Sequence, residues 1–250
     1  MTRIAVVGGT GKLGRMIINT ILENDDVKLT YVIGRKDSEY IGKDISSLIS
    51  TSFKDIPIID EILEAKNCDV FIDCTNAKNF MSNNFDKYMK MRKPLVISTT
   101  GFNIEDIKKI EDLANTIPVF KTGNFSIEFH NFIETIKFIG KKISKDTDIS
   151  IIEYHHNQKK DAPSGTAEMI QDALIKANTK LTKEDIPIFS IRGGNIVGEH
   201  KVVFSNSNDE VIELKHQISS RKAFASGAVS IAKWIKKQPV GLYDMDDYCK

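Results

Sequence analysis

Hydrophobic residues in the first half of the chain form short runs that alternate with segments of helical composition. The apolar runs, several of them rich in β-branched residues, are typical of buried strands and cover 3–7, 27–33, 69–74, 94–98 and 118–120. The segments of helical composition cover 15–22, 79–91 and 105–114. Strands that alternate with helices predict a Rossmann-like, doubly wound parallel sheet, an α/β fold that binds ligands beyond the carboxyl ends of its strands.

The pattern changes after residue 125. Ser126 is a suitable N-cap for an apolar-periodic helix over 127–143. Strand patterns then follow without regular helices between them, over 148–154, 188–192, 199–204 and 210–218. A helix over 163–176 accompanies these strands, with Pro163 in its first turn. We therefore expect a smaller α+β domain with an antiparallel or mixed sheet.

The first strand leads directly into a glycine-rich turn and a helix. The turn reads Gly8-Gly9-Thr10-Gly11-Lys12-Leu13-Gly14. GxGxxG spacing alone is weak evidence, but strand, turn and helix in this order are the context of a dinucleotide-binding fingerprint. Glycines permit the tight turn and let the backbone approach a pyrophosphate, which the helix N-terminus favours. We expect the whole turn to contact a dinucleotide.

The end of the second strand indicates which dinucleotide is bound. An NAD site usually places Asp or Glu about 20 residues beyond the glycines, on the ribose 2′-hydroxyl. Here Gly34-Arg35-Lys36 follows the strand, so cations stand where a 2′-phosphate would bind. Lys12 would add further positive charge, although a solvated basic turn is the alternative interpretation. We predict NADPH, with use of NADH left open.

Three later loops are expected at the same edge of the sheet, because each follows a predicted strand. They contain Thr75-Asn76, Thr99 to Phe102, which follows the strand end at Ser98, and Gly123 to Ser126. Each loop taken singly is ordinary turn chemistry. The predicted cofactor contacts in the last two loops are Ser98, Thr99, Thr100, Gly123, Asn124 and Phe125.

The stretch from Glu153 to Thr166 combines imidazoles, ammonium groups and a helix start. Backbone N–H groups at a helix start have no intrahelical partner and can hold a carboxylate. His155, His156 and Lys159 lie just upstream. Taken alone, the histidines would more often be structural and the lysine solvated. Together they indicate an enzyme that acts on a small carboxylate.

Bulk properties agree with an enzyme and exclude some other classes. Lys+Arg 35 and Asp+Glu 34 give a net charge of +1, so no large field recruits nucleic acid or membrane. The chain shows no apolar signal core and no run near 20 apolar residues, and we expect a cytoplasmic protein. Cys68 and Cys74 flank a strand and Cys249 lies apart, so we expect buried thiols there and no disulfide or metal site.

Several motifs together resemble those of one family. The pattern Glu-x-His-His-x-x-Lys-x-Asp-Ala-Pro-Ser-Gly-Thr-Ala runs from Glu153 to Ala167 and resembles the signature of the dihydrodipicolinate (4-hydroxy-tetrahydrodipicolinate) reductases of lysine and diaminopimelate biosynthesis. The segment from Arg192 to His200 is similar to the family's Arg-Gly-Gly-x-Ile-Val-Gly-Glu-His. The Thr-Thr-Gly-Phe and Asn-Phe-Ser loops are similar too. The resemblance covers nearly the whole chain. Gln158 and Lys160 depart from common family residues without touching the roles below, whereas Gly34 stands where the family often has an acidic residue.

The resemblance implies reduction of a cyclic imine dicarboxylate by hydride from the nicotinamide. It implies His155 as proton donor and acceptor, Lys159 as second proton donor, and His156 at one end of the substrate. Ser164, Gly165 and Thr166 would hold a substrate carboxylate. Family members are usually homotetramers, and their last helix, here from Arg221 through Trp234, returns to the nucleotide domain. We therefore expect 1–125 and 222–250 to bind the dinucleotide, and 126–221 to bind substrate and form the oligomer.

Two other classes share the glycine turn. One is a different NAD(P)-dependent oxidoreductase, such as an amino-acid dehydrogenase. That function would not explain the presence of the segment from Asp161 to Thr166. The other is a non-catalytic NADP-sensing Rossmann protein, which would not need His155 and Lys159 beside an anion-binding helix start.

Overall fold

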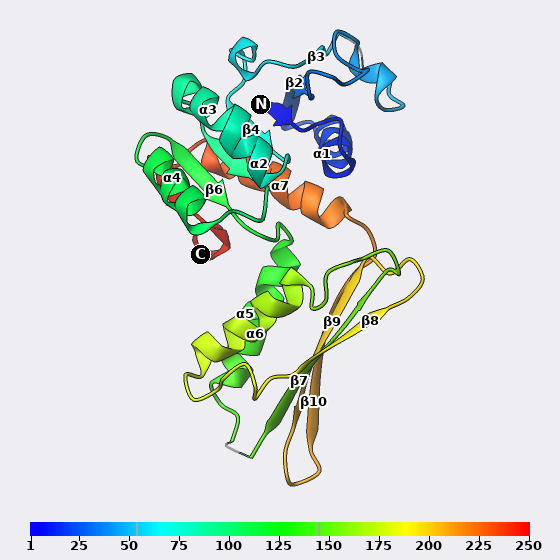
Figure 1. The fold of residues 1–250 in the computed structure, drawn as a ribbon, viewed down its shortest axis with the longest axis vertical. Helices are drawn as coiled ribbons and strands as arrows, with labels where there is room; N and C mark the ends of the chain where they lie inside the picture. Colours follow the sequence, from blue (N-terminus) through cyan, green and yellow to red (C-terminus); the bar gives the residue numbers. More distant parts are fainter. Residues whose placement is uncertain (54, 145) are drawn as a thin grey trace. The chain divides into compact units, whose positions relative to one another are not determined.

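The computed structural model describes residues 1–53, 55–144 and 146–250, and the chain divides into two compact units. The first unit comprises residues 1–125 and 222–250, and the second comprises residues 126–221 (Figure 1). The first unit is therefore built from both ends of the chain.

The first unit contains a seven-stranded sheet in which every neighbouring pair is parallel, in the order β11-β6-β5-β4-β1-β2-β3. Its strands are β1 (Thr2–Val7), β2 (Val27–Ile33), β3 (Ile58–Ile59), β4 (Val70–Asp73), β5 (Leu95–Ile97), β6 (Pro118–Lys121) and β11 (Gly241–Tyr243). β1 lies between β2 and β4, so the strand order reverses next to the glycine turn. The predicted Rossmann-like fold is confirmed.

Helices cover both faces of this sheet. The regular helices of the unit are α1 (Lys12–Leu22), α2 (Ala77–Asn79), α3 (Phe85–Met91), α4 (Ile104–Ala114), α7 (Lys222–Ile235) and α8 (Met245–Tyr248). Tight turns occur at η1 (Ile45–Ser47) and η2 (Ile62–Glu64), and η3 (Phe80–Asn84) is a π-helix. α3 and α4 pack on the face that carries Ala5 and Phe71, whereas α1 packs beside α7 (Figure 1). The helix expected over 79–91 is thus interrupted by the π-helix.

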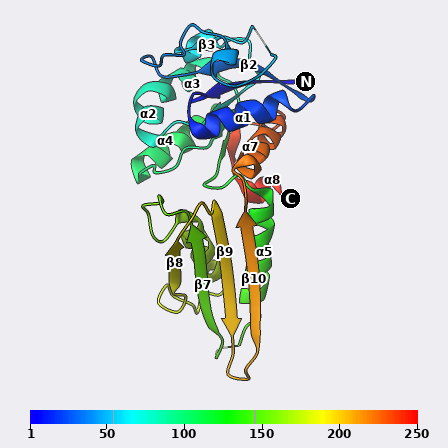
Figure 2. The same ribbon diagram turned by 90° about the vertical axis from the view of Figure 1, so that its right-hand side faces the viewer.

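The second unit is a four-stranded sheet with two helices. It consists of α5 (Ile127–Gly140), β7 (Asp148–His155), α6 (Gly165–Ala177), β8 (Ile188–Arg192), β9 (Gly198–Ser205) and β10 (Val211–Ile218). In the order β10-β9-β7-β8, the β7–β8 pair is parallel and the other pairs are antiparallel. Figure 2 shows both helices behind the sheet, on one of its faces. The sheet is therefore mixed, as expected.

Two local expectations differ from the structure. α6 begins at Gly165, because the Ser164 hydroxyl caps the helix by accepting from the Ala167 N–H at 3.2 Å. Pro163 consequently precedes the cap and is not in the first turn. Cys68 is buried, but the Cys74 thiol is only half-buried and donates to the Val7 carbonyl at 3.1 Å.

Across the described ranges, no helix combines the length and the apolar character that crossing a bilayer requires.

Candidate functional site

The glycine turn of the first unit is folded tightly between β1 and α1. The N–H groups of Gly8 and Gly9 donate to the Ile33 carbonyl at 2.8 and 3.2 Å. Gly8 has a φ of +81°, which favours glycine. A Cβ at Gly14 would lie 2.4 Å from the Gly8 carbonyl oxygen, so only glycine lets α1 approach the turn this closely.

The start of α1 is suited to an anion. Its N-cap, Gly11, has no side-chain cap, and the first turn contains no acidic residue. The Arg15 side chain donates hydrogen bonds to the carbonyls of Thr10 in the turn and of Leu48, both at 3.1 Å. Its guanidinium also lies 5.3 Å from the centre of the Tyr40 ring. Sequence analysis assigned no role to Arg15, although its position one turn into the helix is the signal that could have indicated one.

A pocket opens at the carboxyl ends of β1, β2 and β4. It is lined by Val7, Gly8, Thr10, Ile33, Gly34, Arg35, Lys36, Asp37, Asp60, Glu61, Glu64, Thr75, Asn79, Asn83, Asn84 and Lys87. Arg35 pairs with Asp37 at 3.6 Å, but both side chains are more than three-quarters exposed, so the pair is weak. A Cβ at Gly34 would meet Ile41 at 3.1 Å and Thr10 at 3.2 Å, which leaves little room for a longer side chain. The structure thus places Gly34 and the two cations together in the pocket with the glycine turn.

A buried carboxylate connects the loops that follow β4 and β5. Asp73 accepts from the N–H and hydroxyl of Thr75, the hydroxyl of Thr99, the amide of Asn84 and the phenol of Tyr88. Burial, reinforced by this carboxylate, raises the pKa of Tyr88, so the phenol stays a donor. From the sequence, Asp73 was predicted only as part of a strand. Its role could not be seen there, because its hydrogen-bond partners come from four different positions along the chain.

The remaining predicted cofactor residues lie on the two loops after β5 and β6. Ser98 is half-buried and Thr100 and Gly123 are exposed, whereas Asn124 and Phe125 are buried. A Cβ at Gly227 of α7 would lie 1.8 Å from the Phe125 carbonyl oxygen, so the helix fixes the backbone of this loop. These loops therefore offer a ligand mainly their backbone and their exposed small residues.

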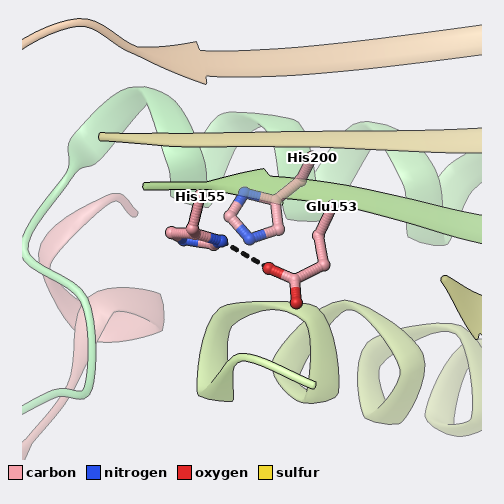
Figure 3. Close-up of side chains that lie close together, drawn as sticks. All are labelled: Glu153, His155 and His200. Atoms are coloured by element: carbon pink, nitrogen blue, oxygen red, sulfur yellow. Dashed lines mark ion pairs between the residues drawn. The ribbon is translucent and has the colours of Figure 1, made fainter. Parts of the chain in front are cut away.

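In the second unit, three polar side chains meet on the helix-covered face of the sheet. Glu153 and His155 come from β7 and His200 from β9, with 0%, 7% and 4% of their surfaces exposed. His155 Nδ1 contacts Glu153 Oε2 (Figure 3). The rings of His155 and His200 are 5.3 Å apart and nearly perpendicular, and His200 Nε2 lies 3.3 Å from the Ser164 hydroxyl. This cluster adjoins the start of α6.

The second oxygen of Glu153 is also held. Glu153 Oε1 accepts from Arg192 Nη2 at 2.7 Å and from the Ser164 N–H at 3.2 Å. The same Arg192 nitrogen donates to the Asp161 carbonyl at 2.6 Å. Burial alone would raise the pKa of Glu153, but donors that include Ser190 and Arg192 hold it at about 2. Glu153 is therefore a buried, ionised carboxylate that joins β7, β8 and the start of α6.

The charge of Lys159 acts on His155. Burial lowers the pKa of His155, Glu153 opposes that effect, and the charge of Lys159 adds to it. Lys159 Nζ lies 2.7 Å from Asp161 Oδ2, and its side chain is about one-fifth exposed. His156 is half-buried and accepts from the Lys159 N–H at 3.1 Å. The predicted proton donors thus share one charged environment.

The start of α6 differs in detail from its prediction. The Ser164 N–H is used by Glu153, and its hydroxyl is used by the helix cap and His200. In the part of the chain that the structure describes, the N–H groups of Gly165 and Thr166 have no protein partner. Gly165 is exposed, with nothing within 4 Å of the place a Cβ would take. The N–H groups of Gly165 and Thr166 are therefore the donors that remain at this helix start, while Ser164 keeps it in place.

Glu153, His155 and His200 also offer ligand atoms that lie within 4.8 Å of one another, a spacing that could admit a metal ion. The guanidinium of Arg192, 2.7 Å from the carboxylate, opposes a divalent cation there. The expectation that this protein needs no metal remains a prediction.

Comparison with known proteins agrees with both units. Residues 2–125 match the family described as Dihydrodipicolinate reductase, N-terminus, and residues 130–249 match Dihydrodipicolinate reductase, C-terminus. The 4-hydroxy-tetrahydrodipicolinate reductase of Buchnera aphidicola subsp. Acyrthosiphon pisum is 40% identical over 98% of this chain and 97% of the relative. The enzyme of that name from Clostridium tetani is 38% identical over 98% and 96%.

Solved structures show the same fold. A dihydrodipicolinate reductase from Paenisporosarcina sp. TG-14, described as dipicolinate-bound, has a TM-score of 0.81 at 23% identity, covering 98% of this chain and 97% of that one. An amine dehydrogenase from Mycobacterium smegmatis has a TM-score of 0.65 at 14% identity, over 98% and 95%. The fold is thus shared more widely than the sequence motifs. From the matches over both units and the identity to named relatives, the chain belongs to the dihydrodipicolinate reductase family.

Proposed function

We propose that this chain is a 4-hydroxy-tetrahydrodipicolinate reductase, which uses NAD(P)H to reduce a cyclic imine dicarboxylate to tetrahydrodipicolinate in lysine and diaminopimelate biosynthesis. The observation that carries the proposal is the cluster in the second unit. There the buried His155 and the partly exposed Lys159 share one charged environment. They lie close to a helix start where, among the residues described, the N–H groups of Gly165 and Thr166 have no protein partner. Family membership makes the chain an NAD(P)H-dependent oxidoreductase, and this cluster supplies the acid–base chemistry.

The residues divide the work as follows. The N–H groups of Gly165 and Thr166 bind one substrate carboxylate, and His156 contacts the other end of the substrate. Lys159 adds positive charge that favours the dianion and acts as a proton donor. His155 exchanges a proton with the substrate, since imidazole titrates near neutral pH. When bound to the first unit, the nicotinamide supplies the hydride.

One assay separates this function from the alternatives. The product of dihydrodipicolinate synthase is generated in the cuvette, and oxidation of NADPH is followed at once. Other imino acids and keto acids are supplied in parallel. We expect turnover with the synthase product alone. Turnover with an amino-acid-derived imine instead would identify an amino-acid dehydrogenase, and binding of NADPH without turnover would identify a sensor.

We further propose that the cofactor is NADPH in preference to NADH. The support is the pair of exposed cations, Arg35 and Lys36, at a strand end where Gly34 replaces a carboxylate. Arg35→Ala combined with Lys36→Ala should lower kcat/KM for NADPH by roughly 10- to 100-fold, the value of one or two charge-assisted hydrogen bonds. The value for NADH should change little.

Steady-state kinetics with both cofactors measures this change. Lys108→Ala, at an exposed lysine of α4 outside the pocket, is the matched control. A wild-type protein with equal or better kcat/KM for NADH would contradict the preference.

Assembly into a homotetramer belongs to the same proposal. On the sheet face opposite the helices, β8 exposes Phe189 and Ile191, with 54% and 42% of their surfaces accessible. A second copy of the chain would cover such apolar side chains. Light scattering of the purified protein measures the mass and tests this state. A cytoplasmic location is proposed with it, because NADPH is a cytoplasmic reductant.

A further inference from the structure

We infer that Glu153 is a positioning residue that fixes the tautomer and the orientation of His155, an inference that rests on the proposed function. Nothing in the sequence motif assigns the carboxylate this role. The geometry of the cluster in Figure 3 does.

The contact between the two side chains selects one tautomer. Glu153 and His155 are two residues apart on β7, so both side chains point to the same face of the sheet. Glu153 Oε2 and His155 Nδ1 are both buried, and each has the other as its polar neighbour. An ionised carboxylate only accepts hydrogen bonds, so the neutral imidazole must carry its proton on Nδ1. The Nε2 atom then holds the lone pair that can exchange a proton with a ligand.

The opposite side of the ring is kept clear by a glycine. A Cβ at Gly198 would lie 3.2 Å from His155 Nε2, tighter than an ordinary contact. His200 packs against the ring nearly at a right angle and restricts its rotation. The imidazole is thus held on its Nδ1 side, and the glycine leaves space beside Nε2.

Glu153 itself cannot rotate away from His155. Its other oxygen accepts from Arg192 and from the Ser164 N–H, and Arg192 is tied in turn to the Asp161 carbonyl. These bonds fix the carboxylate plane. The oxygen that remains therefore faces the imidazole.

The charged groups around His155 make opposite predictions for two variants. Those groups are Glu153, Lys159, Arg192 and the neighbouring His200 ring. Burial, Lys159 and Arg192 lower the pKa of His155, whereas Glu153 raises it. Glu153→Gln should therefore lower the pKa of His155, and Arg192→Gln should raise it.

The first experiment reads the tautomer directly. The full chain is labelled with ¹⁵N-histidine, and the Nδ1 and Nε2 signals of His155 are followed by NMR across a pH titration. In the wild type we expect a single Nδ1-protonated tautomer at neutral pH. Glu153→Gln should mix the two tautomers and shift the titration to lower pH, and Arg192→Gln should shift it to higher pH. Glu199→Gln, a glutamate on the other face of the sheet, is the matched control.

The second experiment reads the consequence for catalysis. Glu153→Gln should lower kcat by roughly 10- to 100-fold, a part of the roughly 10²–10⁴-fold that general acid–base catalysis contributes, with KM little changed. The acidic limb of the pH profile should move in the direction seen by NMR. Adding Glu153→Gln to His155→Ala should cause no further loss, because the carboxylate acts through the imidazole.

The two experiments distinguish a failure of this inference from a failure of the proposed function. The NMR titration needs no turnover, so a wild type without reductase activity would refute the function and leave the tautomer measurable. Unchanged tautomer and pKa of His155 in Glu153→Gln would overturn the inference. If that variant does not fold, Glu153→Asp keeps the charge with a shorter reach. Full activity and an unchanged titration in Glu153→Asp would overturn the inference equally.

Discussion

Replacing His155 or Lys159 by alanine lowers kcat by roughly 10²–10⁴-fold while the chain stays folded. His155 is a buried imidazole with a glycine beside its Nε2 atom, and in the proposed function it exchanges a proton with the substrate. In the proposed function, Lys159 carries the ammonium group that stabilises the dianionic substrate and is the second proton donor. Each variant removes a group needed in the transition state, so the main loss should be in kcat.

Steady-state kinetics with NADPH and the synthase product measures the loss, and circular dichroism checks the fold. Lys160→Ala is a matched control, since Lys160 is the exposed neighbour of Lys159 and has the same side chain. The control should retain the wild-type rate. Near-full turnover in both His155→Ala and Lys159→Ala would remove these two residues from the mechanism.

The sequence predicted the fold class well because the strong signals were local. Runs such as 27–33 and 188–192 have the same bounds in the structure as in the prediction. β3 and β11 were not predicted, because two or three residues are too few to show a period. The π-helix that splits the segment 79–91 was also invisible, because its residues have ordinary helical composition.

The candidate site could be predicted only as far as its motifs were contiguous. His155 and Lys159 stand in one short segment, so their types and spacing were enough to propose a proton-transfer site. The roles of Glu153, Arg192 and His200 depend on contacts between distant positions. Arg192 reaches Glu153 across 39 residues, and His200 reaches Ser164 across 36. Only the register of the mixed sheet brings these side chains together.

A contact with another element also explains why the role of Ser164 differs from its prediction. As a residue type at a helix start, it indicated an anion-binding group. In the structure its N–H already donates to Glu153, a residue of another element. The motif therefore indicated a candidate segment but could not show which of its donors remain available.

The free energy of unfolding falls as the pH is lowered from about 6.5 to about 4.5, and His200 is the main cause. His200 is 4% exposed, and burial together with His155 lowers its pKa to about 3, although Glu153 opposes the shift. In the unfolded chain a histidine titrates near 6.5. Between these values the unfolded chain binds a proton that the native chain does not, so stability rises with pH. The contribution is complete above about pH 6.5 and is lost as the pH falls towards 3.

The pH dependence of the free energy of unfolding can be estimated from the single proton that His200 binds in the unfolded chain. A single histidine gives a slope of at most about 1.4 kcal/mol per pH unit. His155 and His216 also have pKa values lowered chiefly by burial, so they act in the same direction. The Glu153 carboxyl, whose pKa is held at about 2, loses its contribution only below the unfolded value near 4.3. The change in the free energy of unfolding between about pH 6.5 and 4.5 therefore comes from the histidines and not from Glu153.

Urea unfolding at several pH values and one fixed protein concentration measures the slope for the wild type and for His200→Asn. The variant lacks the titrating ring, so its slope between about pH 6.5 and 4.5 should be smaller by about 1 kcal/mol per pH unit. Its stability at neutral pH should also be lower, because the ring packs on His155 and meets the Ser164 hydroxyl. Above about pH 7 the two slopes should agree, which provides an internal control. Identical slopes below about pH 6.5 would show that His200 takes up its proton in the folded chain as readily as in the unfolded one.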